Sequence, residues 1–279
     1  MTVEVRDAAT VMLVRDGDAG LEVFMVRRNL RSDFVGGAHV FPGGAVDPAD
    51  RRADLGAVCA GRTDAQASAA LGVPSGGLAF WVAAVRECFE EAGVLLAYDA
   101  GGSVVRLDDP AVEDRFARHR AEVTAGRRRL VEVCEQESLR LAVDALHYFS
   151  HWITPVGPPR RYDTRFFVAA APEAQVPLHD DAETVASTWI APSEALRRHE
   201  DGEFDLILPT IRNLAALARF RSAGDLLAAA AAIDEVPTIQ PRVVVEEGGG
   251  VRILLPGDPG YADAGEALPE GMPLPGRTA

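Results

Sequence analysis

The sequence predicts an α/β fold, and three patterns carry this prediction. Two β-prone runs at 9–14 and 21–26 are separated by a short turn-rich connection, so we expect them to form an antiparallel hairpin. Further strand-like runs follow at 146–153 and 165–170. Between these regions, an amphipathic helical pattern ends at Gly93, which suits a left-handed cap. One side of this helix is an apolar stripe suited to packing on a sheet: Trp81, Val85, Cys88, Phe89 and Ala92.

The composition is that of an ordinary globular protein, with 48% hydrophobic and 25% charged residues among 279. We expect a single domain over 1–279. The net charge is −14, and all 28 basic residues are arginine because the sequence contains no lysine. Binding to nucleic acid or to a membrane surface is therefore not expected, since both need clustered positive charge. The missing lysine also excludes Schiff-base and P-loop lysine chemistry.

The cysteines and the first residues suggest a reducing compartment. Cys59, Cys88 and Cys134 are far apart and show no CxxC spacing, so neither a disulfide framework nor a structural zinc site is indicated. Residues 1–20 lack the apolar core of a signal peptide, and no apolar run approaches the roughly 20 residues that span a bilayer. We therefore expect a cytoplasmic location.

An acidic segment, from Arg86 to Gly93, ends the predicted helix. Glu87, Glu90 and Glu91 are spaced so that their side chains emerge on one helix face. Carboxylates at this spacing repel one another unless positive charge lies among them. Arg86 offsets part of this repulsion, and Mg2+ or Mn2+ would offset more, because these cations prefer oxygen ligands. A solvated acidic face is the alternative, so the segment needs support from elsewhere in the chain.

Arginines and glycines follow the predicted hairpin. Arg27 and Arg28 come directly after the second run and could hold phosphate oxygens, although surface solvation is the default. A short strand at 38–41 is then followed by the pair Gly43 and Gly44. Glycine pairs after a strand let the backbone approach a ligand closely.

The acidic segment resembles the second half of the Nudix box, R-E-U-x-E-E-x-G-U, where U is a bulky aliphatic residue. Residues 86–94 match it, with Cys88 in one U position. The first half, a glycine followed after five residues by glutamate, is matched by Gly44 and by Asp50, which replaces the glutamate. The 35 residues 51–85 separate the two halves, where the ordinary box has seven. The sequence thus resembles a Nudix hydrolase with an interrupted box.

Other segments resemble the long-insert Nudix proteins related to the peroxisomal coenzyme A diphosphatases. They are 23–28, 38–44, 152–155, 161–167 and 254–258. This resemblance covers most of the chain and implies a Nudix α/β/α sandwich with a mixed β-sheet. Because the superfamily changes substrate through its loops, the fold transfers more safely than the substrate.

Insertions and a C-terminal extension are expected around this single domain. An insert at 51–79 splits the box, and charged, helix-prone residues at 108–143 predict a helical insert broken near 124–126. A hairpin pattern covers 240–255. Pro, Gly and Ala dominate 256–279, so we expect an extended tail, either disordered or draped on the surface.

The resemblance also implies a site and a reaction. Glu87, Glu90 and Glu91, with the carbonyl of Gly44, would hold Mg2+ or Mn2+, and a metal-activated water would attack phosphorus in line. The bond cut would be the diphosphate bond of a nucleoside diphosphate derivative, with coenzyme A or an acyl-CoA-like substrate favoured. Glu183, on a polar loop, is the candidate for the general base, with a solvated loop residue as the alternative.

The resemblance implies catalytic roles for four residues: Arg86, Glu87, Glu90 and Glu183. Substrate phosphates would be positioned by arginines: Arg27, Arg28, Arg160, Arg161 and Arg165. The competing hypothesis is a Nudix-fold binding or regulatory module that recognises a nucleotide without cleaving it, because Asp50 and the long insert could displace the first half of the box. A homodimer is left open.

Overall fold

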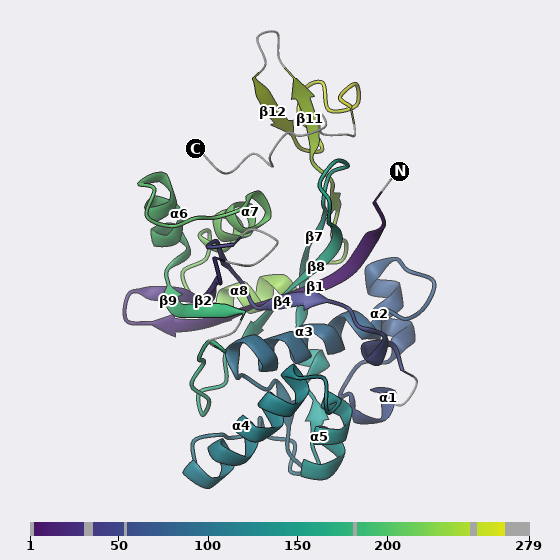
Figure 1. Ribbon diagram of the computed structural model, residues 1–279, viewed down its shortest axis with the longest axis vertical. Helices are drawn as coiled ribbons and strands as arrows, with labels where there is room; N and C mark the ends of the chain where they lie inside the picture. The colour runs from purple at the N-terminus through teal and green to yellow at the C-terminus, as the bar shows by residue number, and fades with distance from the viewer. Residues whose placement is uncertain (1–2, 31–35, 53–54, 181–182, 246–249, 266–279) are drawn as a thin grey trace.

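The computed structural model describes residues 3–30, 36–52, 55–180, 183–245 and 250–265 of the chain. The end of the predicted tail, 266–279, and the turn of the predicted C-terminal hairpin, 246–249, lie outside these residues. Helices cover both faces of a mixed sheet, which gives the predicted α/β/α sandwich (Figure 1). Within the described ranges, no helix has the length and apolar character needed to cross a membrane.

The sheet is built around the long strand β1 (Val5–Gly17). It pairs antiparallel with β2 (Gly20–Arg28), which confirms the predicted opening hairpin. It also pairs antiparallel with β4 (Gly43–Ala45) and parallel with β8 (Arg161–Ala170). The remaining strands extend the sheet on both sides: β3 (His39–Val40) and β9 (Thr184–Ile190) beside β2, β7 (His147–Ile153) beside β8, and β10 (Thr238–Ile239) beside β7.

Side chains alternate along β1, and both faces of this strand are buried. Val11 and Leu13 join Trp81 in one core, on the face covered by α3. Met12 and Val14 lie in a second core on the opposite face, covered by α6, α7 and α8. Burial on both faces fixes the register of the strand, because a slip of one residue would exchange the two sets. The helices concerned are α3 (Leu78–Ala92), α6 (Pro192–Glu200), α7 (Leu208–Leu217) and α8 (Ala223–Ala231).

Two helical insertions lie on the α3 side. The first carries α1 (Leu55–Val58) and α2 (Asp64–Leu71), and the second carries α4 (Pro110–Thr124) and α5 (Leu130–Glu137). Asp109 caps α4 by accepting hydrogen bonds from the N–H groups of Ala111 and Val112 at 2.9 and 3.1 Å. α4 ends at Thr124 and α5 begins at Leu130, which confirms the predicted break between two helices near 124–126. Shorter elements complete this region: turns of 3-10 helix at Pro48–Arg51 and Val143–Ala145, and strands β5 (Ala97–Tyr98) and β6 (Arg140–Leu141).

The structure differs from the prediction in where β8 begins. The sequence predicts a strand at 165–170, whereas β8 begins at Arg161. The additional residues pair in parallel with Val5–Ala8 of β1, a long-range contact that local apolar alternation does not reveal. The predicted C-terminal hairpin is confirmed as β11 (Arg242–Val245) and β12 (Val251–Leu254), which pair antiparallel and project from the sheet beyond β7 (Figure 1).

Candidate active site

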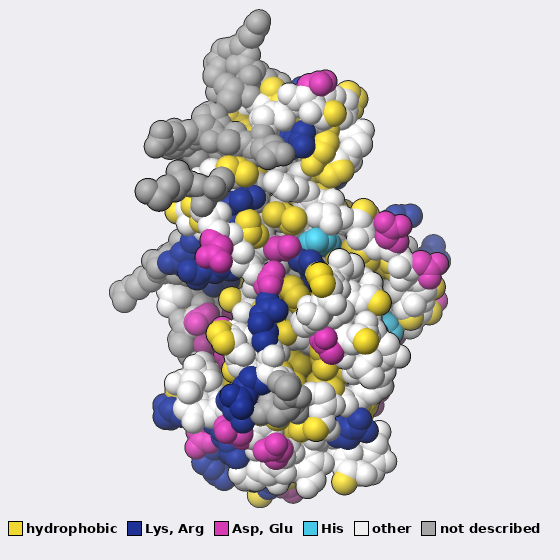
Figure 2. All heavy atoms as spheres, turned by 90° about the vertical axis from the view of Figure 1, so that its right-hand side faces the viewer, with side chains coloured by type: hydrophobic (Ala, Val, Ile, Leu, Met, Phe, Trp, Pro, Cys, Tyr) yellow, Lys and Arg dark blue, Asp and Glu magenta, His cyan; other side chains and the backbone are white. Residues whose placement is uncertain are grey.

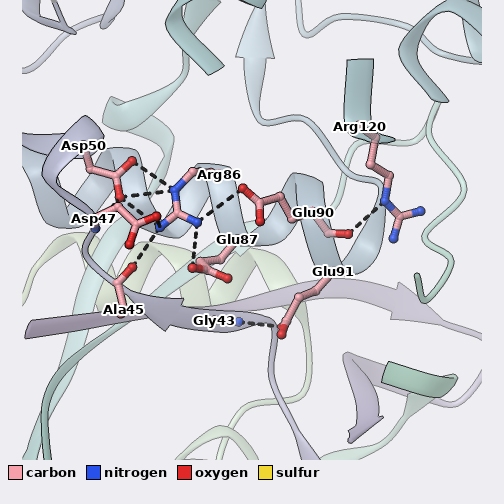
Figure 3. Close-up of polar contacts among 9 residues, drawn as sticks. All are labelled: Gly43, Ala45, Asp47, Asp50, Arg86, Glu87, Glu90, Glu91 and Arg120. Carbon is pink, nitrogen blue, oxygen red and sulfur yellow. Dashed lines mark hydrogen bonds and ion pairs between the residues drawn. The ribbon is translucent and has the colours of Figure 1, made fainter. Parts of the chain in front are cut away.

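The acidic segment occupies the last turns of α3. The predicted apolar stripe is buried, with each side chain at most 1% exposed: Trp81, Val85, Cys88, Phe89 and Ala92. Gly93 ends the helix at φ 68°, in the left-handed region that favours glycine. Packing therefore fixes the rotation of α3, and its glutamates lie beside β4 (Figure 3).

The fold brings the two halves of the interrupted box together. The backbone N–H of Gly43 donates to Oε2 of Glu91 at 2.9 Å. A Cβ added at Gly44 would lie 2.5 Å from Oε1 of Glu87, so a larger residue at this position would displace the Glu87 carboxylate. Gly44 therefore lies beside the acidic segment, although residues 51–85 separate the two halves of the box in sequence.

Asp50 forms a buried ion pair with Arg86. Nε of Arg86 donates to Oδ1 of Asp50 at 3.0 Å, and Nη2 donates to Oδ2 at 2.9 Å (Figure 3). Nη2 also donates to the carbonyl of Ala45 at 2.8 Å. Asp50 is 3% exposed and Arg86 is 8% exposed. The aspartate that replaces the box glutamate therefore makes a bidentate contact with the box arginine.

The guanidinium group of Arg86 also donates hydrogen bonds to Glu87 and Glu90, in addition to Asp50. Nη1 of Arg86 donates to Oε1 of Glu87 at 2.8 Å and to Oε1 of Glu90 at 3.3 Å. Burial raises the pKa of Glu87 to about 7, with the negative charges of Glu90 and Asp50 adding to the shift and Arg86 opposing it. Burial likewise raises the pKa of Glu90, and burial together with Glu87 raises the pKa of Glu91 well above its usual range. The acidic segment thus buries more carboxylate than one arginine neutralises.

The side chains of Glu87, Glu90 and Glu91 have the chemistry to bind a hard divalent cation. The donors are all oxygen atoms, which Mg2+ and Mn2+ prefer, and the surplus of buried carboxylate would be relieved by a cation. However, Glu87 and Glu90 turn oxygens toward Arg86, and Glu91 turns one toward Gly43. Among the described residues, no group of three or more His, Cys, Asp or Glu side chains is arranged to hold a metal ion. Coordination of one ion by all three glutamates would therefore require their side chains to turn toward a common point.

The first insertion holds the start of α3. Oδ1 of Asp64 accepts from the N–H of Leu78 and Oδ2 accepts from the N–H of Gly76, both at 3.0 Å. Oγ of Ser68 accepts from the N–H of Gly77 at 2.9 Å. Gly77 is the N-cap residue and has no side chain of its own. The segment that splits the box therefore satisfies N–H groups that the first turn of α3 leaves free.

The second insertion holds the end of α3. Arg120 of α4 donates from Nε to the carbonyl of Glu90 at 2.9 Å (Figure 3) and from Nη2 to the carbonyl of Leu178 at 3.0 Å. The N–H of Leu178 donates to the carbonyl of Ala92 at 2.9 Å. Leu178 precedes the loop that carries Glu183. Arg120 therefore ties the acidic segment to the segment that leads to the candidate base.

Sequence reasoning missed Arg120 and Asp64. Each is an ordinary charged residue on a helix, and its partner on α3 lies far away in the chain, 30 positions for Arg120 with Glu90 and 14 for Asp64 with Leu78. No local pattern distinguishes such residues from solvated surface charges. The one local clue is Gly77, a helix start without a capping side chain, which requires acceptors from elsewhere.

A cavity of about 970 Å³ opens beside the acidic segment. Its volume is within the range of sites for small molecules and cofactors. The cavity is lined by Glu87, Glu90, Glu91 and Glu183. The charge of Glu183 contributes to the raised pKa of Glu91, after burial and Glu87. The predicted base and the three glutamates of α3 therefore face one cavity.

The predicted phosphate-binding arginines divide into two groups. Arg28 and Arg160 line the cavity. Arg27, Arg161 and Arg165 are not among the described residues that line it. Nε of Arg27 donates instead to the carbonyl of Gly37 at 3.3 Å.

Alternation along β8 explains the position of two of these arginines. Arg161 is 8% exposed, and its Nε donates to the carbonyl of Thr154 at 3.1 Å. Arg165 is 5% exposed, pairs with Asp163 and lies over the ring of Phe80 at 4.9 Å. Both arginines occupy odd-numbered positions of β8, whereas the even-numbered positions carry the residues that line the cavity.

Comparisons with known proteins agree on one family. The model of the NUDT19 Nudix domain matches residues 57–217. Acyl-coenzyme A diphosphatase NUDT19 of Homo sapiens is 31% identical over 283 residues, which cover 89% of this chain and 74% of that protein. The protein of the same name from Gallus gallus is 33% identical over 310 residues, covering 92% of this chain and 80% of that protein.

A solved structure supports the same assignment. The crystal structure of a Nudix hydrolase from Alicyclobacillus acidocaldarius is similar with a TM-score of 0.67 and 29% identity, covering 81% of this chain and 96% of that one. The family match begins inside the first insertion, so Gly44 and Asp50 lie outside it and are assigned to the box by the contacts described above. These findings confirm the predicted family and fold. The chain therefore belongs to the Nudix hydrolases, in the group of the NUDT19 Nudix domain.

Proposed function

We propose that this protein is a metal-dependent diphosphohydrolase that cleaves the diphosphate bond of coenzyme A or an acyl-CoA. The observation that carries the proposal is the reassembled box: three glutamates of α3 lie beside Gly44 at a cavity that also contains Glu183 and Arg28. The names of the relatives, acyl-coenzyme A diphosphatases, support this choice among nucleoside diphosphate derivatives.

Glu87, Glu90 and Glu91, together with the carbonyl of Gly44, would hold Mg2+ or Mn2+. Such an ion would neutralise diphosphate charge and lower the pKa of a bound water, so that the water attacks phosphorus in line. The Asp50 contact with Arg86 orients the guanidinium group between Glu87 and Glu90.

Residues around the acidic segment would bind the substrate and move its proton. Arg28 and Arg160 line the cavity and would contact the oxygens of the diphosphate. Glu183 would accept the proton of the attacking water, as a carboxylate at the same cavity. One P–O bond of the diphosphate breaks as the water oxygen bonds to phosphorus, which leaves two phosphate monoesters.

The test is turnover of a substrate panel. Purified protein is incubated with coenzyme A, an acyl-CoA, NADH, ADP-ribose and a nucleotide sugar, with Mg2+, with Mn2+ and with chelator, and products are identified by mass. We expect two phosphate monoesters from coenzyme A or its acyl ester, and none with chelator. Turnover of another panel member alone would contradict the substrate assignment, and undiminished turnover in chelator would contradict the metal requirement.

A second candidate is a nucleotide-binding module without catalysis. The observation in its favour is that one oxygen of Glu87 and one of Glu90 accept from Nη1 of Arg86. Ligand binding without metal-dependent product in the same panel would support this candidate. A cytoplasmic location and a homodimer stay predictions.

A further inference from the structure

The floor of the cavity runs across four strands. Ala45 on β4 pairs with Ala8 on β1, and Ala8 pairs with Thr164 on β8. Thr164 in turn pairs with Trp152 on β7. All four residues line the cavity. Because neighbouring strands lie about 4.8 Å apart, the two ends of this row are separated by about 15 Å, and the cavity extends well beyond the acidic segment.

The two ends of the cavity differ in chemistry. Carboxylates line the end at β4, whereas the end at β7 carries four apolar side chains: Trp152, Phe166, Val243 and Ile253. They come from the sheet and from the C-terminal hairpin. Figure 2 shows hydrophobic side chains at the surface where the projecting hairpin, at the top, meets the body of the molecule. A charged ligand group thus suits one end and an apolar group the other.

The hairpin contributes one cross-strand pair to this apolar end. Val243 on β11 pairs with Ile253 on β12, and both line the cavity. Val244 and Arg252 form the next pair. Because side chains alternate along a strand, this second pair points to the other face of the hairpin, and neither residue is among the described residues that line the cavity.

The hairpin is anchored to the floor through β10. Ile239 of β10 pairs in parallel with Trp152 of β7. Oγ1 of Thr238 lies 2.8 Å from Nδ1 of His151, and Nε2 of His151 lies 2.5 Å from Oδ1 of Asp163. Residues 240–241 alone separate β10 from β11. The short connection holds Val243 and Ile253 against the apolar end of the floor.

We propose that the apolar end of the cavity binds the acyl chain of the substrate, and that Val243 and Ile253 set the preference for its length. This inference rests on the proposed function, because the diphosphate is placed at the acidic segment. Every methylene taken from water by the apolar lining adds affinity, whereas free coenzyme A has no chain to place there. The hairpin acts on substrate binding and not on bond cleavage, since it is anchored at β7, three strands away from β4 and the glutamates beside it.

The test is titration calorimetry without divalent metal, using free coenzyme A, a short-chain acyl-CoA and a long-chain acyl-CoA. We expect affinity to rise with chain length in the unaltered protein. Ile253→Asp should weaken long-chain binding about tenfold while free coenzyme A changes less than about twofold. Val243→Thr, which is nearly isosteric, should shift the same ratio by a smaller factor and serves if Ile253→Asp does not fold. Val244→Thr, on the other face of the hairpin, is the matched control and should change neither affinity.

Turnover with Mg2+ or Mn2+ then separates the two proposals. Ile253→Asp should raise KM for the long-chain ester and leave kcat unchanged. Equal affinity of the unaltered protein for all three ligands, or equal loss for all three in Ile253→Asp, overturns the assignment of the hairpin. If chain length and Ile253→Asp act on affinity as expected but no ligand is cleaved, the assignment stands and the proposed function fails.

Discussion

The two ends of α3 are held by different insertions, in complementary ways. At the start, Asp64 of the first insertion accepts hydrogen bonds from free backbone N–H groups. At the end, Arg120 of the second insertion donates to the carbonyl of Glu90. A carboxylate at the N-terminus and a cation at the C-terminus both complement the helix dipole. Each insertion thus satisfies backbone groups that α3 cannot pair by itself.

The two ends of α3 differ in their distance from the glutamates that would bind the metal. The helix has 15 residues, so its ends lie about 22 Å apart. Asp64 acts at the end remote from the glutamates, whereas Arg120 contacts the backbone of Glu90 itself. The first insertion should therefore contribute to stability, and the second to the geometry of the acidic segment. The predictions below begin at the acidic segment and move outward.

The largest effect is expected at the glutamates. Glu90→Gln and Glu91→Gln should each lower kcat/KM by more than about 100-fold, because loss of a metal ligand should exceed the 10–100-fold cost typical of groups that orient ligands. Steady-state kinetics at saturating Mg2+ measures this. Glu113→Gln, at an exposed residue of α4, is the control and should be fully active. Full activity of either glutamate variant would contradict the metal site.

The buried ion pair comes next. Asp50→Asn should lower the free energy of unfolding by about 3 kcal/mol, because it leaves the buried charge of Arg86 with less compensation. Denaturant unfolding measures the loss. The control is Asp7→Asn, which removes the surface pair with Arg51, both side chains being about 40% exposed. We expect less than about 1 kcal/mol there, and equal losses would show that burial is not decisive.

Arg120→Ala tests the end of α3. We expect kcat to fall about tenfold, as for groups that orient ligands, with a smaller change in KM for free coenzyme A. Arg118→Ala, an exposed arginine on the same helix, should have no effect. Arg120→Lys should recover part of the activity, because lysine can restore one of the two hydrogen bonds. If kcat is unchanged while stability drops, Arg120 acts on stability alone, like Asp64.

Asp64→Ala tests the start of α3. We expect a loss of about 1 kcal/mol in the free energy of unfolding, the usual cost of losing a helix cap, with kcat and KM unchanged. Thermal unfolding and steady-state kinetics measure the two quantities. Asp114→Ala, an exposed aspartate on α4, is the matched control. A tenfold loss of kcat in Asp64→Ala would erase the contrast between the two ends.

The smallest effect is the pH dependence of this cap. Backbone N–H donors of Leu78 and Gly76 hold the pKa of Asp64 below its usual value of 3.8. The unfolded chain therefore binds a proton more readily, so the contribution of Asp64 is full above pH 3.8 and is lost as pH falls through the lower, folded-state pKa. Unfolding of the unaltered protein and Asp64→Ala should converge over this acidic range. A constant difference would contradict the prediction.

Local patterns were sufficient to predict much of the fold. The 3.6-residue period of Trp81, Val85 and Phe89 identified the buried side of α3, and Gly93 identified its end. The β-prone runs at 9–14, 21–26 and 146–153 identified β1, β2 and β7. The start of β8 at Arg161 was missed, since its pairing with β1 depends on residues more than 150 positions away.

The sequence by itself determined which residues belong to the acidic segment and that their spacing places them on one face of a helix. Only the tertiary structure decided that Gly44 lies beside Glu87 and Asp50 pairs with Arg86, that Arg161 and Arg165 lie outside the cavity lining, and that the C-terminal hairpin contributes Val243 and Ile253 to it. The physical reason is the range of the interactions. Helical and strand periods relate near neighbours in sequence, whereas ion pairs across insertions and sheet pairing relate residues that are near only after folding.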